Sequence, residues 1–182
     1  MSSLLISESY RKTQEHLHEN PNYGVASIEF APLVAEIINN LGVTALCDYG
    51  AGKCNLMKTI NEKRLVKHAF KYLPYDPAIP RFADAPEPTE MCVCLDVLEH
   101  IEPDLLDNVL NDLERVTEVV GLFTIHTGPA VKVLDDGRNA HLIQKPASWW
   151  LPKLMERFDL QSFAKTEHGF TVVVYAHGVN NQ

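Results

Sequence analysis

The sequence predicts an α/β fold, with a doubly wound, mostly parallel sheet and a helical segment at its N-terminal end. Three observations predict it. Short apolar runs alternate with amphipathic segments along the chain, which is typical of a parallel sheet with helices on both faces. A glycine turn, Gly50-Ala51-Gly52, stands between one such run and the next amphipathic segment. The 182 residues, 46% of them apolar, fit one domain over residues 1–182.

The first part of that domain, residues 1–42, is predicted to be helical. Residues 8–19 carry few apolar side chains and predict a polar, solvent-facing helix, on which His16 and His18 would be solvated. Turn-forming residues then end it. A second helix begins at Ser27 and ends at Gly42, because its apolar residues recur at helical spacing.

The core is predicted over residues 43–182, as strands that alternate with helices. The predicted strands are residues 43–49, 69–73, 91–95, 119–125 and 171–176. The predicted helices are residues 56–65, a helix that begins at Pro103, and residues 146–158. Ligands of such folds bind at the carboxyl ends of the strands, so functional residues are expected there.

Charge and composition disfavour several classes of protein. The chain has 16 Lys and Arg against 24 Asp and Glu, a net charge of −8, whereas binding to long nucleic acids requires a surplus of basic residues. The sequence shows neither a long apolar run nor the basic-then-apolar order of a signal peptide, so we expect no membrane association. The four cysteines lie in or beside apolar runs, as free thiols do in a reducing compartment. We therefore expect a cytoplasmic protein.

The glycine turn within residues 47–55 is the first candidate site. Glycine lets the backbone approach a ligand closely, although any tight strand-to-helix turn can use the same residues. A dinucleotide-binding fingerprint would place a third glycine at Asn55, and a P-loop would place Ser or Thr at Cys54.

Two further features follow the next two strands. Asp76 stands where a carboxylate can accept both hydroxyls of a ribose, unless it serves only an Asp-Pro turn. Residues 96–103, Asp-Val-Leu-Glu-His-Ile-Glu-Pro, follow the strand at 91–95. Features at three successive strand ends favour a nucleoside-type ligand.

In this order and spacing, three segments resemble the motifs of class I S-adenosylmethionine (SAM)-dependent methyltransferases. They are DYGAGKCNL, YDP and LDVLEHIEP, and the likeness is carried by residues 44–126. Together with DGRNAHLI, they are similar to small methyltransferase-like proteins encoded by tailed bacteriophages. The resemblance implies a compact, Rossmann-like methyltransferase fold with SAM as its cofactor.

The resemblance also implies which residues bind that cofactor. The loop beneath the methionine part of SAM would consist of Asp48, Gly50, Ala51 and Gly52. Asp76 would bind the ribose hydroxyls, and Asp96 and Val97 would line the cofactor from the family's fourth strand.

The chain departs from the family pattern in two places. Cys54 stands where the loop usually has its third glycine. The interval 77–90 is too short for the usual helix, strand and adenine-side acidic residue, so we expect the fold to be shortened between the family's second and fourth strands. Asp84 is the remaining candidate for the adenine site.

A metal site is suggested by Asp96, Glu99 and His100, which a helical turn would place on one face, and by the later His141. Carboxylates and imidazoles of this kind can bind Mg²⁺ or Mn²⁺. The spacing is similar to that of metal-dependent O-methyltransferases, including those that act on small-RNA 3′ ends and those of ubiquinone biosynthesis. The alternative is that Glu99 and His100 pair or pack without a metal.

The candidate catalytic residues are His126, His141, Glu99 and His100. His126 follows the strand at 119–125, and its ordinary pKa suits a general base. Arg138 is a candidate clamp for an acidic group of the substrate, unless Asp135 or Asp136 pairs with it.

We therefore predict a SAM-dependent methyltransferase that acts on an O or N nucleophile of a small molecule, a nucleotide or an RNA end, with or without a metal. The alternative is a non-catalytic SAM-binding regulatory module, which the short interval and Cys54 suggest. Asn55 disfavours a nicotinamide-dependent reductase.

Overall fold

The computed structural model describes residues 4–20 and 23–179, and its centre is a six-stranded sheet in the order β2-β1-β3-β4-β6-β5. The parallel strands are β2 (Lys71–Tyr75), β1 (Ala45–Tyr49), β3 (Thr89–Leu95) and β4 (Thr117–His126). The antiparallel strands are β6 (Gly169–Ala176) and β5 (Phe158–Lys165). The mixed but mostly parallel sheet confirms the predicted fold class.

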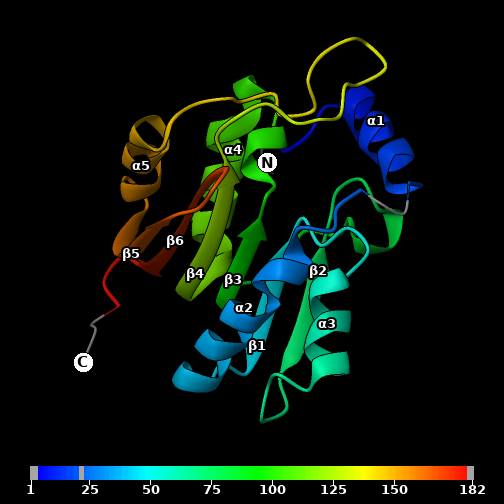
Figure 1. Ribbon diagram of the computed structural model, residues 1–182. Coiled ribbons are helices and arrows are strands. Elements are labelled where there is room, and N and C mark those ends of the chain that lie inside the picture. The colour runs from blue at the N-terminus through cyan, green and yellow to red at the C-terminus, as the bar shows by residue number, and fades with distance from the viewer. Residues whose placement is uncertain (1–3, 21–22, 180–182) are drawn as a thin grey trace.

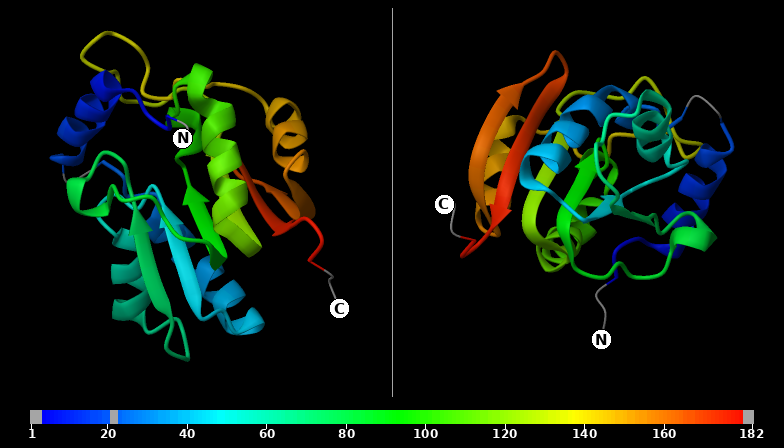
Figure 2. Two further views of the ribbon diagram at one scale, coloured as in Figure 1. Left: turned by 180° about the vertical axis from the view of Figure 1, so that it is seen from behind. Right: turned by 90° about the horizontal axis from the view of Figure 1, so that it is seen from below.

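Helices cover both faces of this sheet (Figure 1). One face carries α2 (Ser27–Leu41) and α3 (Asn55–Lys63), and the view from behind shows α4 (Leu106–Val116) on the other face (Figure 2). α5 (Ala147–Met155) lies beside β5 and β6, and α1 (Glu8–His18) lies at the carboxyl ends of the parallel strands. The carboxyl ends of the parallel strands, where ligands of such folds bind, therefore lie next to α1.

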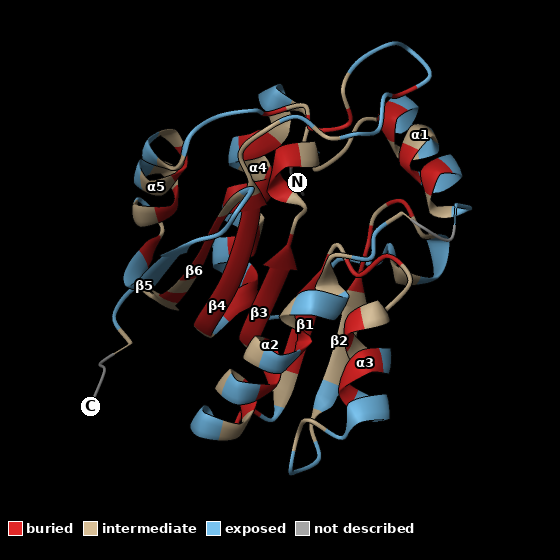
Figure 3. Cartoon of the chain, viewed as in Figure 1, coloured by how far each residue is buried: buried red, intermediate tan, exposed pale blue. Residues whose placement is uncertain are grey.

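The central strands β1, β3 and β4 are the most deeply buried part of the molecule (Figure 3). On the α4 face, Leu110 and Leu113 belong to a buried cluster with Phe123 of β4. On the α2 face, Ile38 belongs to a cluster with Leu46 of β1. Both clusters follow from the apolar periodicities of these helices and strands, because each element buries one apolar side against the sheet.

The C-terminal hairpin is where the predicted elements are wrong. The helix predicted over residues 146–158 ends at Met155, and Phe158 begins β5 instead, with its ring centroid 5.3 Å from that of Phe123. Every other residue of β5 is exposed. An edge strand of this kind shows no alternation of buried and exposed residues, so the pattern for a strand is absent from its sequence.

The interval between β2 and β3 is short, as predicted. Residues 77–88 are all described and contain only a 3₁₀ turn at Pro80–Phe82, so β2 is the edge strand of the sheet. The Arg115 side chain of α4 secures this interval, donating from one terminal nitrogen to Pro86 O at 2.9 Å and from Nε to Asp112 Oδ1 at 2.9 Å. Asp112 also accepts the Tyr49 hydroxyl at 2.9 Å, which links the interval to β1.

The helix α1 is not solvent-facing all round, which corrects the expectation from its polar sequence. Tyr10, Gln14 and Leu17 on its inner side are buried. Tyr10 donates its hydroxyl to His100 O at 2.8 Å, and Gln14 Nε2 donates to the Tyr10 oxygen at 2.7 Å. The polar residues of this helix are therefore used to attach it to the strand ends.

The four cysteines Cys47, Cys54, Cys92 and Cys94 are free thiols, as predicted.

Among the described residues, no helix has the length and apolar character needed to cross a membrane.

The pairing of β4 with β6 predicts that Gly169 tolerates no side chain. A Cβ at this position would lie 1.9 Å from Ile125 O and 2.9 Å from the Cα of His126. We expect Gly169→Ala to lower the free energy of unfolding by at least about 1–3 kcal/mol, measured by urea denaturation. Gly128→Ala is the control, because its nearest contact is 3.5 Å away. Equal losses in the two variants would contradict the steric argument.

Candidate functional site

A cavity of about 1320 Å³ lies at the carboxyl ends of the parallel strands, bounded also by α1 and by the loop after β4. It exceeds the ~300–1000 Å³ that is usual for one small ligand, so it has room for two small ligands. The predicted site residues that line it are Asp48, Gly50, Ala51, Gly52, Asp76, Asp96, Val97, His100, His126 and His141. Glu99 is fully buried beside it.

The glycine turn after β1 requires its glycines. Gly50 and Gly52 have φ of 85° and 50°, and a Cβ on Gly50 would lie 2.4 Å from a methyl carbon of Val97. The backbone N–H groups of Gly50 and Ala51 donate to Tyr75 O at 2.8 and 3.0 Å. Cys54, at the place of the third glycine, also has a positive φ of 55°, a conformation that is strained for a residue with a side chain. The backbone of the turn thus keeps the shape that a third glycine would allow.

Asp76 is fixed by the backbone on both sides of its carboxylate. The Gly52 N–H donates to Oδ2 at 3.0 Å, and the Ala78 N–H donates to Oδ1 at 2.9 Å. Each carboxylate oxygen accepts more than one hydrogen bond, so both oxygens keep capacity for a ligand. The carboxylate is therefore held rigidly next to the glycine turn.

His18 joins this group, and the expectation that it is solvated is wrong. Its Nε2 lies 3.6 Å from Asp76 Oδ2, and its ring lies 3.1 Å from an ideal Cβ on Gly52. Its Nδ1 is buried and has no hydrogen-bond partner within residues 4–20 and 23–179. Burial lowers the pKa of His18, against the opposing effect of the Asp76 charge. The signal that could have revealed it is the i, i+4, i+8 series of Tyr10, Gln14 and His18 along one side of α1.

Asp48 is buried beneath the turn, with 3% of its surface exposed. It accepts a short hydrogen bond from the Tyr72 hydroxyl. Burial nevertheless raises the pKa of Asp48 to about 7, since desolvation outweighs that hydrogen bond. A cationic ligand in the cavity would favour its charged form.

Glu99, His100 and His141 form a second group of neighbouring side chains. Glu99 Oε1 accepts the His126 N–H at 3.0 Å, whereas Oε2 is buried without a partner in the described chain. His100 Nδ1 lies 2.8 Å from Ala140 O, and His141 Nδ1 lies 2.8 Å from Gly128 O. A carbonyl oxygen only accepts, so each Nδ1 carries the proton and each Nε2 keeps a free lone pair.

The ligand atoms of this group are close enough together to share one cation. Glu99, His100 and His141 offer ligand atoms that all lie within 4.8 Å of one another. Burial raises the pKa of Glu99 well above its ordinary value and, with His141 nearby, lowers the pKa of His100 to about 4. Burial also lowers the pKa of His141. Neutral imidazoles whose other nitrogen donates to a carbonyl are typical metal ligands.

Asp96 does not belong to the group formed by Glu99, His100 and His141. It has a positive φ of 53°, and its Oδ1 accepts the Thr124 hydroxyl at 2.6 Å. The backbone N–H of Asp96 donates to the same hydroxyl oxygen at 2.8 Å. The carboxylate lines the cavity but lies outside the set of grouped ligand atoms.

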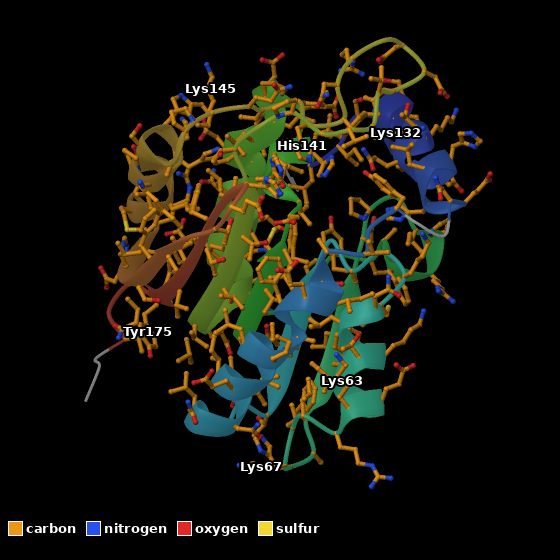
Figure 4. All side chains as sticks on the ribbon, viewed as in Figure 1. Lys63, Lys67, Lys132, His141, Lys145 and Tyr175 are labelled. Atoms are coloured by element: carbon orange, nitrogen blue, oxygen red, sulfur yellow. The ribbon has the colours of Figure 1, made fainter. Side chains whose placement is uncertain are left out.

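His126 also lines the cavity, between two other histidines. Its ring centroid is 4.7 Å from that of His141, and its ring stacks on His168 with centroids 5.3 Å apart. Its Nδ1 lies 3.1 Å from the N–H and 3.2 Å from the C=O oxygen of Gly128, so either neutral tautomer has a partner there. Figure 4 shows His141 above the ends of the strands, on the loop that also carries Lys132 and Lys145.

Two other predicted residues do not reach the cavity. Arg138 donates to Asp136 Oδ2 at 2.8 Å and lies over the Tyr10 ring, which matches the alternative that an acidic neighbour pairs with it. Asp84 is exposed and does not line the cavity, so it is removed as an adenine-site candidate.

The chain is similar in structure to solved methyltransferases. With the 1,6-didemethyltoxoflavin-N1-methyltransferase of Burkholderia thailandensis, which contains S-adenosylhomocysteine (SAH), the TM-score is 0.66 at 14% identity, over 97% of this chain and 92% of that one. With the mitomycin 7-O-methyltransferase, the TM-score is 0.61 at 13% identity, over 91% of this chain and 60% of that one. With the SAH-bound magnesium protoporphyrin IX methyltransferase of Synechocystis PCC 6803, the TM-score is 0.53 at 11% identity, over 93% of this chain and 94% of that one.

No protein-family model matches the sequence, and the comparison with curated proteins gave no match. At these low identities, the similarity shows the fold, which is the α/β fold of SAM-dependent methyltransferases. The resemblance to phage-encoded proteins stays a prediction.

The buried carboxyl of Asp48 predicts a particular pH dependence of stability. The folded protein keeps the proton of Asp48 up to about pH 7, whereas the unfolded chain releases it near the ordinary value of 3.8. The free energy of unfolding therefore falls as the pH rises through this window, by on the order of 4 kcal/mol in all and by about 2–3 kcal/mol above pH 5. We expect Asp48→Asn to remove this part of the decline, measured by urea denaturation between about pH 5 and about pH 8.

Asp84→Asn is the control, because its carboxylate is exposed and should leave the decline unchanged. Identical pH profiles for Asp48→Asn and the wild type would contradict the assignment.

Proposed function

We propose that the protein transfers a methyl group from SAM to an oxygen or nitrogen nucleophile of a small molecule, a nucleotide or an RNA end. The observation that carries the proposal is that one cavity is lined by the glycine turn with Asp76 and by His100 and His141, with Glu99 buried beside these two histidines. The glycine turn with Asp76 suits a nucleoside, and the two histidines with Glu99 suit a methyl acceptor. The shared fold with SAH-bound methyltransferases supports the same function.

At the cofactor end, the chain supplies position and charge. The backbone of the glycine turn lies beneath the methionine part of SAM, and Asp76 accepts the ribose hydroxyls, with His18 beside it. Asp48 offsets positive charge, since SAM carries a sulfonium and an ammonium group. SAM itself supplies the activated methyl group, and the protein contributes mainly alignment and the exclusion of water.

At the acceptor end, the residues fit a divalent cation. Glu99 Oε2 and the Nε2 atoms of His100 and His141 would hold it, because the first is a buried orphan and the others have free lone pairs. A mixed oxygen and nitrogen set suits Mn²⁺ better than Mg²⁺, which prefers oxygen ligands. A bound ion supplies positive charge that lowers the pKa of an acceptor hydroxyl. Asp96 remains a cavity-lining residue rather than a ligand.

The proposed base is His126. When its Nδ1–H donates to Gly128 O, its Nε2 is free to accept a proton from the acceptor. The alternative tautomer, in which Nδ1 accepts the Gly128 N–H, would make Nε2 a donor instead. The backbone of Gly128 thus holds the His126 ring in the same position in both neutral tautomers, which suits a residue that exchanges protons.

The acceptor is proposed to be small. The net charge of −8 disfavours long nucleic acids. The names of two structural neighbours specify methylation at N1 of a toxoflavin precursor and at the 7-oxygen of mitomycin, both small molecules. The free thiols also support our proposal of a cytoplasmic protein.

The second candidate is a SAM-binding regulatory module without catalysis. The short interval 77–88 and the strained Cys54 favour it, because both depart from the family pattern. The orphaned Glu99 Oε2 at the acceptor end favours the enzyme. Binding of SAH without methyl release over a broad panel of small-molecule and nucleotide acceptors would select the module.

Calorimetric titration with SAH tests the cofactor assignment. We expect the wild type to bind SAH. The Asp76→Asn variant should bind SAH at least about tenfold more weakly, since it loses a charged acceptor for the ribose hydroxyls. Asp84→Asn is the matched control, because Asp84 lies outside the cavity and should leave the affinity unchanged. Absence of SAH binding to the wild type would overturn the proposed function.

Paramagnetic resonance of added Mn²⁺ tests the metal assignment independently of turnover. We expect His141→Ala to weaken Mn²⁺ binding about tenfold or more, because one of three protein ligands is lost. His16→Ala is the control, since His16 is exposed on α1. Chelation should also abolish methyl release. Full activity in chelator, or equal Mn²⁺ affinities for the two variants, would reject the ion.

A further inference from the structure

The adenine end of the cavity lacks the elements that the family uses to close it. Residues 77–88 form no strand beside β2, and of this interval only Pro77 and Ala78 line the cavity. Adenine has two flat apolar faces that need cover from water. Two residues next to Asp76 cannot cover both faces, so we expect another part of the chain to provide the second wall.

Apolar residues from several elements line the cavity. They are Tyr75 at the end of β2, Val97 and Ile101 after β3, Val109 of α4, and Leu5 and Ile6 of the N-terminal segment. Leu5 packs against the buried cluster that contains Tyr49 and Tyr75. Because Tyr75 directly precedes Asp76, we expect a ribose bound at Asp76 to place its base near Tyr75 and Leu5.

The N-terminal segment is held in place by side chains near the start of α4. The Ser7 N–H donates to Glu102 Oε2 at 2.7 Å, and Asn108 Nδ2 donates to Leu4 O at 2.9 Å. The views from behind and from below show it crossing from α4 to α1 at the end of the sheet where β2 is the edge strand (Figure 2). It therefore lies on the side where the sheet is shortened.

We propose that Leu5 and Ile6 form one wall of the adenine subsite, replacing the strand and acidic residue that are missing after β2. The proposal rests on the proposed function, since it assumes SAM as the ligand. Tyr75 and Val97 line the cavity as well, Ile6 packs against the cluster that contains Tyr10 of α1, and the hydrogen bonds at Leu4 O and the Ser7 N–H hold the segment in place. The subsite recognises the base by its apolar faces rather than through a carboxylate.

The test compares two ligands that differ only at the base. SAH carries adenine, whereas S-ribosylhomocysteine has the same ribose and amino acid without it. We expect Leu5→Ala to weaken SAH binding about tenfold in calorimetry and to leave S-ribosylhomocysteine binding unchanged, because only adenine would contact Leu5. Leu41→Ala is the matched control, since Leu41 is 49% exposed on α2.

The outcomes separate this inference from the proposed function. Equal losses for both ligands would show that Leu5 acts through the fold, and unchanged SAH affinity would show that Leu5 does not contact the base. Either result overturns the inference while SAH binding by the wild type still supports the function. If the wild type binds no SAH, both proposals fail.

A second measurement needs no variant. An SAH analogue with an azide on the adenine ring, irradiated on the wild-type protein, should attach to the peptide that contains Leu5 and Ile6. Attachment confined to residues 77–88 would place the base at the edge of the sheet and overturn the inference.

Discussion

The site depends on the burial of two carboxylates with fewer partners than a charged carboxylate needs. Asp48 is 3% exposed and Glu99 is fully buried, and burial raises the pKa of each. A carboxylate in such surroundings is either protonated or balanced by a cation. In the proposed function, Asp48 balances the cationic cofactor and Glu99 binds a cation beside the acceptor. Each buried carboxyl thus requires either a proton or a nearby positive charge.

The shortened sheet explains why the N-terminal region has so large a part in the cavity. In the described part of the chain no strand lies beyond β2, and the hydrogen bond from Arg115 to Pro86 O attaches the remaining interval to α4. The open end is then covered from the other direction, by residues 4–7 and by α1. Tyr10 and His18 of that helix reach His100 O and Asp76, so the same element that closes the cavity also contacts both of its functional groups.

The sequence predicts those features that depend on local periodicity or on a motif at a strand end. The apolar runs located five of the six strands, and the positions of Gly50 and Asp76 followed from the turns after β1 and β2. β5 was missed because an exposed edge strand has no buried face to reveal it. His18 was misjudged because its burial comes from tertiary docking of a polar helix. Asp96 was grouped with the metal ligands by spacing alone, whereas its left-handed backbone turns it to Thr124.

The most direct test is a crystal structure of the protein with SAH bound. The account predicts that the ribose hydroxyls lie within hydrogen-bonding distance of Asp76 and that the amino group lies over the glycine turn above Asp48. It also predicts that the sulfur faces the group formed by Glu99, His100 and His141. SAH bound outside this cavity, or bound in it with the sulfur directed away from that group, would contradict the account.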